Sequence, residues 1–370
     1  MQNLLRQGKK LSELLADTKF FTYQIICLIV LLIIGTIAQK DIGLYLAHQK
    51  YFASFIVTFF DFVPFPGGYT LLNLMTIGLI LKLITDPLKL SKIGVTISHL
   101  GVLALLIGAG ISSISSSEGN MIIKEKGYSN VVNDYFANEI VIYNLEDDEQ
   151  NLIYKTSFEK LKISDIIANE DLPFQIKIRE KFINTDLIKR SEVGDDLQGF
   201  AKIFKLTSKK SANNYEENIA SISFEIIENG ISKGFYSIFE LMPIKQTFMI
   251  GNKQYQIEIQ KQQTILPFKL SLDRFEKTTY PGTEKAKSYK SYLTISDQNL
   301  AWKAEISMNK PLRYKSYSFY QSSYINDDGT IYSVLAVVKN AGRLFPYIST
   351  IIIAFGILLH LIQRIRSRNV

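Results

Sequence analysis

Histidine is the side chain whose chemistry is most informative in this sequence, because it occurs only three times in 370 residues. His48 follows the first long apolar run, His99 lies inside a later run, and His360 lies near the end of the last one. A neutral imidazole binds transition metals, including the iron of haem, and it exchanges protons near neutral pH. The role open to each histidine therefore depends on its position relative to a membrane.

His99 is the strongest candidate for a functional side chain. It lies in the segment Thr96-Ile-Ser-His-Leu-Gly101, inside an apolar run that begins after Lys92. At about 1.5 Å per residue, the ring would lie roughly 10 Å within the membrane. An ionisable residue at this depth is costly and marks a functional site by default. We therefore expect His99 to be an axial ligand of haem iron. The competing interpretation is a hydrogen bond to Ser or Asn on a neighbouring helix.

The other two histidines have simpler explanations. His48 lies in a loop after the first apolar run, where we expect a solvated side chain. His360 lies one turn before Arg364, so a position at the membrane interface accounts for it without any function. It is still the second candidate for a haem ligand, because its predicted depth is similar to that of His99.

Four apolar segments are predicted to place these residues in a membrane, which requires about 20 apolar residues, and the second of them is a short span. The predicted spans are residues 20–38, 69–84, 93–113 and 344–362. Residues 51–68 are aromatic but too short to cross, and they end in Pro64-Phe-Pro-Gly-Gly68, which is typical of a turn. We expect an interfacial or re-entrant segment there. Leucines at helical spacing within residues 1–19 predict an amphipathic surface helix, with an unstructured basic tail as the alternative.

Basic residues flank the predicted spans and define their orientation. Lys or Arg residues lie close to the spans in the N-terminal segment, in the turn at 85–92 and in the C-terminal tail. Such residues are retained in the cytoplasm, so residues 39–68 and 114–343 lie outside. This pattern also explains the formal net charge of +7 without a nucleic-acid partner. The predicted domains are residues 1–19, 20–113, 114–343 and 344–370.

Residues 114–343 are predicted to form one large β-rich domain. Segments that alternate apolar and polar residues, or are rich in β-branched and aromatic ones, occur at 139–143, 221–226, 254–259 and 331–337. The fold class is therefore a membrane protein with four transmembrane α-helices and a large extracytoplasmic domain of sandwich or barrel type. One short helix is predicted within it, at residues 157–167. The domain has no histidine and no cysteine, and Cys27 is the only cysteine of the chain, which excludes a disulfide framework.

Several segments, in order along the chain, resemble ResB, also called CcsB, a membrane protein of System II cytochrome c biogenesis. The strongest is Met308-Asn-Lys-Pro-Leu-Arg-Tyr314, followed by Phe319-Tyr-Gln-Ser-Ser-Tyr324. The family's Pro-Gly pair before the last span is replaced here by Ala341-Gly342. The other matching segments are Gly35-Thr-Ile-Ala-Gln39, Tyr51-Phe-Ala-Ser-Phe55, Pro64-Phe-Pro-Gly-Gly68, Asn73-Leu74, Ser98-His-Leu-Gly101, Leu266-Pro-Phe268, Leu272-Asp273, Phe275 and Tyr280-Pro-Gly282.

The resemblance implies a function in haem delivery. A ResB protein pairs with a CcsA-type membrane partner, moves haem b outward and presents it to the CxxCH motif of an apocytochrome c. In that family a third-span histidine ligates haem, and His99 matches it. The tryptophan-rich haem-handling motif belongs to CcsA, and Trp302 is the only tryptophan here. The resemblance thus implies the non-catalytic subunit of a holocytochrome c synthase (haem lyase), located in the bacterial cytoplasmic membrane.

Two other classes of membrane protein share this layout. A membrane insertase or secretion chaperone also carries a large outer β domain, but such proteins usually need a hydrophilic groove within the membrane. The spans offer only Asn73, Ser98, His99 and, near one edge, Lys82 for such a groove. A sensor needs a cytoplasmic output domain, and the inner segments are too short to form one.

Overall fold

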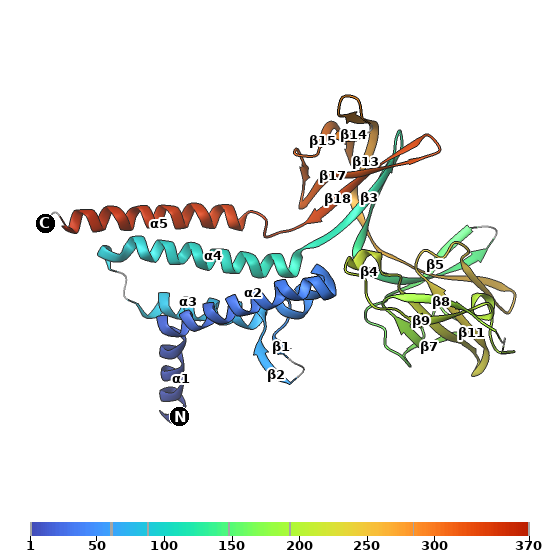
Figure 1. Ribbon diagram of the computed structural model, residues 1–370, viewed down its shortest axis with the longest axis horizontal. Coiled ribbons are helices and arrows are strands. Elements are labelled where there is room, and N and C mark those ends of the chain that lie inside the picture. Colours follow the sequence, from blue (N-terminus) through green and yellow to red (C-terminus); the bar gives the residue numbers. More distant parts are fainter. Residues whose placement is uncertain are drawn as a thin grey trace. The chain divides into compact units, whose positions relative to one another are not determined.

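The computed structural model describes residues 2–59, 62–86, 89–146, 149–191, 194–283 and 285–368 (Figure 1). The chain divides into two compact units. The helical unit is Met1–Ser117 with Lys339–Val370, and the strand-rich unit is Glu118–Val338.

The helical unit confirms the four predicted spans. Its helices are α1 (Gln2–Leu15), α2 (Thr18–Ala47), α3 (Gly68–Thr85), α4 (Ile93–Ser115) and α5 (Phe345–Arg368). Among the described residues, four helices are long and apolar enough to cross a membrane, namely α2 to α5. The first is longer than predicted, because α2 bends at Gly43 (φ 79°) and continues into one π-helical turn, η1 (His48–Phe52). Asp17 begins α2 by accepting a hydrogen bond from the Lys19 N–H at 2.9 Å.

The segment between α2 and α3 is a small β-hairpin. β1 (Ile56–Phe59) pairs antiparallel with β2 (Val63–Pro66), so the prolines lie in a strand and not in the predicted turn. The turn follows β2, at Gly67 and Gly68. A Cβ at either glycine would lie 2.3 Å from a backbone carbonyl oxygen, that of Ser54 or Phe52. Only glycine allows this close approach of two backbones.

The strand-rich unit contains three sheets. The largest has ten strands, the second has the order β11-β10-β7-β6, and the third is the hairpin β8–β9. All four strands predicted from the alternation are confirmed. Its strands are β3 (Ser117–Lys124), β4 (Tyr128–Glu146), β5 (Glu149–Ser157), β6 (Ile166–Ile167), β7 (Gln175–Phe182), β8 (Thr185–Lys189), β9 (Phe204–Ser208), β10 (Ser221–Glu228), β11 (Ile231–Phe239), β12 (Gln246–Ile250), β13 (Lys253–Thr279), β14 (Ala286–Asp297), β15 (Leu300–Ser307), β16 (Leu312–Tyr314), β17 (Tyr317–Asp327) and β18 (Thr330–Lys339).

The predicted helix at residues 157–167 is wrong. This segment consists of turns followed by β6. The backbone N–H of Ser164 donates to the carbonyl of Ile178 on β7 at 2.9 Å, and the N–H of Ile178 donates back to Asp165 at 2.9 Å. Pairing with β7 therefore satisfies backbone groups that a helix would have satisfied internally.

Two hydrophobic cores stabilise the strand-rich unit, and the long strands β4 and β13 contribute to both. Ile140 of β4 and Ile257 of β13 belong to the first core, together with the fully buried Phe224 of β10 in the second sheet. Val132 of β4 and Leu270 of β13 belong to the second core. Because the two strands pair with each other in both regions, they join the two cores into one unit.

Candidate functional site

Helix α4 holds His99, and one face of this helix carries three glycines. Gly94, Gly101 and Gly108 are buried and recur every seven residues, which places them on the same face. A Cβ at Gly94 would lie 2.4 Å from the backbone nitrogen of His360, and one at Gly101 would lie 2.9 Å from that of Ile353. The backbones of α4 and α5 therefore approach closely along this glycine seam, as small residues permit between membrane helices.

His99 lies on a different face of α4. It follows Gly94 by five residues, which corresponds to a rotation of about 140° around the helix axis. Its side chain is half-buried. About four turns later Ser113 returns to the His99 face, and its Oγ lies 2.8 Å from the hydroxyl oxygen of Tyr69 in the first turn of α3. His99 is thus on the α3 side of α4, away from the glycine seam.

His360 lies on the glycine seam, so the two candidate ligands do not converge. Its backbone nitrogen faces Gly94, and its Nδ1 is buried with no hydrogen-bond partner among the described residues. Because Gly94 precedes His99 by five residues, the two histidines differ in level by about 7.5 Å along α4. The similar depth expected from the sequence is therefore not what the structure shows.

His48 and the nearby lysines lie apart from these two histidines. His48 begins η1, where its side chain is exposed and its ring centroid lies 6.1 Å from that of Phe52. Lys89 and Lys92 are exposed before α4, and Lys82 forms an ion pair with Asp86 at 3.2 Å. In the described part of the chain, no group of three or more His, Cys, Asp or Glu side chains could hold a metal ion.

The imidazole of His99 could bind a ligand that the chain itself does not supply, such as haem iron. None of the described residues forms a hydrogen bond or ion pair with its side chain. The competing interpretation, a hydrogen bond to a neighbouring helix, is therefore not what the structure shows. The same face of α4 also has room. A Cβ at Gly110, which is three turns further along this face, would meet nothing within 4 Å.

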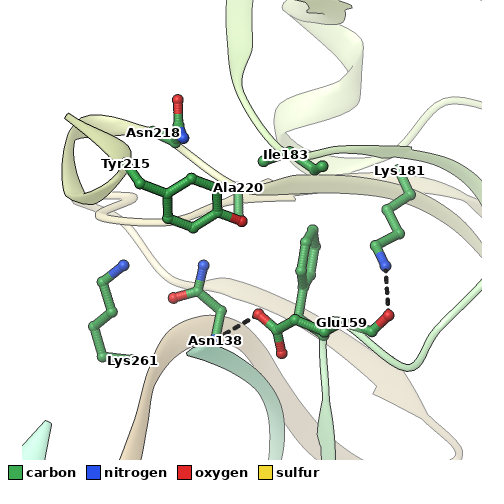
Figure 2. A pocket seen from close by; sticks show the side chains of 9 residues that line it. Asn138, Glu159, Lys181, Ile183, Tyr215, Asn218, Ala220 and Lys261 are labelled. Atoms are coloured by element: carbon green, nitrogen blue, oxygen red, sulfur yellow. Dashed lines mark hydrogen bonds between the residues drawn. The ribbon is translucent and has the colours of Figure 1, made fainter. Parts of the chain in front are cut away.

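The strand-rich unit has a partly open cavity of about 140 Å³, which both polar and apolar side chains line (Figure 2). A cavity of this size holds about one benzene ring, so it does not hold a porphyrin. The lining charges have partners: Lys261 pairs with Glu240 at 3.1 Å, and Lys181 donates to the carbonyl of Leu161 at 2.7 Å. Burial lowers the pKa of Lys181 below its ordinary value. Asn138, also in the lining, donates through Nδ2 to Glu240 at 3.2 Å.

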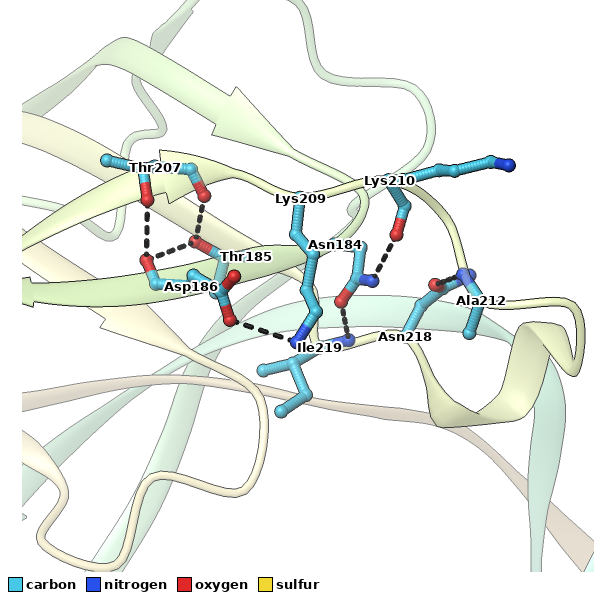
Figure 3. A network of polar contacts seen from close by, with 9 residues as sticks. All are labelled: Asn184, Thr185, Asp186, Thr207, Lys209, Lys210, Ala212, Asn218 and Ile219. Atoms are coloured by element: carbon cyan, nitrogen blue, oxygen red, sulfur yellow. Dashed lines mark hydrogen bonds and ion pairs between the residues drawn. The ribbon is translucent and has the colours of Figure 1, made fainter.

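A second polar cluster supports the loop that follows the β8–β9 hairpin (Figure 3). Asn184 is buried, and it donates to the carbonyl of Lys210 at 2.8 Å and accepts from the N–H of Ile219 at 3.1 Å. Lys209 pairs with Asp186 at 3.0 Å. Both ends of the Asn184 amide are satisfied, so this cluster acts as a support for the loop.

Comparison with known proteins gives one family and one curated relative. Residues 233–344 match the ResB-like family. The protein NrfI of Wolinella succinogenes is 24% identical over 271 residues, which make up 72% of this chain and 27% of NrfI. The chain therefore spans about a quarter of the length of this relative. The family match runs from β11 to the residue before α5; it includes the segments 308–314 and 319–324 and lies outside α4.

Proposed function

We propose, from the match of residues 233–344 to the ResB-like family, that this chain works in cytochrome c biogenesis. In this proposal it is a subunit of a System II cytochrome c synthase. It helps to bind haem b, to move it across a bacterial cytoplasmic membrane and to present it to the CxxCH motif of an apocytochrome c. The strand-rich unit then lies on the periplasmic side.

The placement of His99 carries the proposal. Its imidazole is half-buried within a span, and no described residue offers it a partner. An imidazole inside a membrane requires a partner, and haem iron binds a neutral ring. When bound, haem supplies the iron for this bond and the vinyl carbons that form thioethers with the CxxCH cysteines.

In this proposal, a few residues of the helical unit have defined roles. His99 would hold the iron on the α3 side of α4, where Gly110 leaves open space. Lys89 and Lys92 are exposed at the cytoplasmic end of α4, where their charges suit the haem propionates. The chain has one tryptophan, one cysteine and no histidine in its strand-rich unit. We therefore assign the second axial ligand and the attachment step to a CcsA-type partner.

The test is haem co-purification and cytochrome c maturation with a His99→Ala variant of the complex. We expect haem content to fall at least several-fold and maturation to stop, with an unchanged yield of folded protein. Added imidazole should restore part of both, because it can occupy the axial position that the variant leaves open.

His48→Ala is the matched control, since this exposed histidine should be replaceable without loss of either readout. Normal haem content and maturation in His99→Ala would show that the histidine is structural. Absence of any haem absorption band from the purified wild-type complex would instead favour an insertase or a sensor.

A further inference from the structure

The cavity of the strand-rich unit contains a buried acceptor that the chain leaves unsatisfied. Asn138 lines this cavity and is 6% exposed, and its Oδ1 is buried with no hydrogen-bond partner among the described residues. Its Nδ2 donates to Glu240 at 3.2 Å, which fixes the direction of the amide, because a flipped amide would turn its oxygen toward that carboxylate. A buried acceptor without a donor costs stability, and a bound molecule that carries a donor removes this cost.

The same cavity has a cation without a carboxylate partner. Figure 2 shows Lys261 and Lys181 on opposite sides of the cavity. The Lys181 ammonium donates to the carbonyl oxygens of Leu161 at 2.7 Å and Glu159 at 3.2 Å, and it lies 4.6 Å from the centre of the Phe158 ring. None of the described carboxylates forms an ion pair with it. Burial lowers the pKa of Lys181 more than the nearby carboxylates raise it, so an anion in the cavity would stabilise its charged form.

The cavity also has a carboxylate without a cation partner. The side chain of Glu159 accepts from the N–H of Asn138 at 2.9 Å and from the hydroxyl of Ser157 at 2.9 Å. It forms no ion pair with a described residue, and both of its oxygens can accept further hydrogen bonds. In Figure 2 this carboxylate points toward Asn138 and away from Lys181. The lining therefore offers a cation at one place and two acceptors at another.

Volume limits what can bind there. A cavity of about 140 Å³ holds a molecule of about six non-hydrogen atoms, the size of benzene. A small α-amino acid such as alanine has this size, and it carries one ammonium and one carboxylate. The side chains of Ile183 and Ala220 form an apolar part of the lining, which suits a methyl group.

We infer that this cavity is a binding site for a small α-amino acid of about the size of alanine. The carboxylate of the amino acid pairs with Lys181, and its ammonium donates to Asn138 Oδ1 and to the carboxylate of Glu159. Binding of this kind stabilises the strand-rich unit in proportion to the ligand concentration, because the unfolded chain has no such site. The inference does not depend on haem, since none of its residues lies in the helical unit.

The test titrates the purified full-length chain with L-alanine, propionate and ethylamine, by calorimetry and by thermal unfolding. Propionate keeps the carboxylate of alanine and lacks the ammonium, and ethylamine has the reverse. We expect saturable binding of alanine and a rise of the thermal midpoint, with binding of the other two weaker by about ten-fold or more, the effect of one charged hydrogen-bonded contact. L-Tryptophan is the size control and should not bind.

Two outcomes of this series would overturn the inference. Equal affinities for alanine and propionate would show that the ammonium is not recognised. Absence of heat and of any midpoint shift with all of the compounds would show that the cavity holds water only.

A variant of Lys181 isolates the cation. Lys181→Met keeps the length of the side chain and removes its charge, and it should lower the affinity for alanine by about ten-fold or more. Lys205→Met, on an exposed lysine of β9 outside the cavity lining, is the matched control and should bind alanine as the wild type does. Unchanged affinity in Lys181→Met would refute the site. If this variant does not fold, the wild-type series decides the inference by itself.

Discussion

At the scale of single residues, the two histidines of the predicted spans, His99 and His360, have different surroundings. His99 lies on a face of α4 with open space, whereas His360 lies on the glycine seam with a buried and unpartnered Nδ1. An unpaired buried nitrogen costs stability, and replacing it by an apolar group removes that cost. These surroundings support the proposed ligand role of His99 and leave His360 with a packing role in that proposal.

We therefore expect His360→Leu to keep haem content within about two-fold of wild type, with a thermal midpoint equal to or above it, because the substitution removes an unsatisfied polar atom. Haem absorbance and thermal unfolding of the purified complex measure both quantities. A several-fold loss of haem in His360→Leu, at normal stability, would assign an axial ligand to the seam instead.

At the scale of elements, the glycine seam makes α4 and α5 a closely packed pair. A substitution at Gly101 forces a Cβ to within 2.6 Å of the Ile353 side chain and 2.9 Å of its backbone nitrogen, so α5 must shift. We expect Gly101→Ala to destabilise the helical unit by about 1–3 kcal/mol, as overpacking does in a filled core. Gly110→Ala is its control in the same helix, because this Cβ meets open space. Thermal unfolding in detergent compares the two, and equal midpoints would contradict a tight seam.

In the strand-rich unit, Glu225 of β10 is a buried carboxylate whose pKa lies below its ordinary value. The main cause is a hydrogen bond from Ser232, and Arg179 adds a hydrogen bond and its charge, while burial opposes both. A depressed pKa stabilises the fold above the pKa of the unfolded chain, and this stability is lost as the pH falls through the folded value.

Ser232→Ala should therefore raise the pKa of Glu225 and shift acid unfolding to higher pH. Circular dichroism of the full chain during acid titration measures the midpoint. Ser208→Ala, on an exposed serine of β9, is the control. Identical midpoints for the two variants would show that the Ser232 hydrogen bond does not contribute.

At the scale of the whole molecule, two properties can be tested without reference to His99: the orientation of the chain in the membrane and its need for a partner protein. Basic residues beside the spans predict both chain ends in the cytoplasm. A periplasmic reporter fused after Phe200 should be active, and a cytoplasmic reporter fused after Val370 should be active. An external C-terminus would contradict the four-span topology.

The second test at this scale is reconstitution of the chain alone with haem and apocytochrome c. We expect no thioether product, since the chain has a single cysteine and a single tryptophan, and its three histidines all lie outside the strand-rich unit. Covalent haem staining of the apocytochrome measures this. Efficient attachment without a partner would show that the chain is a complete synthase.

The sequence was sufficient for features that depend on composition and period. The four apolar runs and the alternating strands were confirmed because each is a pattern of consecutive residues that does not depend on tertiary pairing. The missed features depend on tertiary pairing. Residues 157–167 pair with β7 and do not form the predicted helix. The prolines expected in a turn lie in strand β2. The direction of His99 around α4 also depends on which face packs against α5. The seven-residue repeat of Gly94, Gly101 and Gly108 in the sequence indicates which face of α4 packs against α5.

The ends of α4 and α5 meet where the chain leaves the helical unit and returns to it. Ser112 of α4 lies 3.0 Å from the side-chain oxygen of Asn340, and the N–H of Ala341 donates to Ser115 Oγ at 3.3 Å. The residues between these contacts thus begin and end at neighbouring points. In terms of architecture, the strand-rich unit is an insertion into a helical hairpin, and a short turn could close that hairpin without it. Such an insertion can be exchanged as one piece without breaking the contact between α4 and α5.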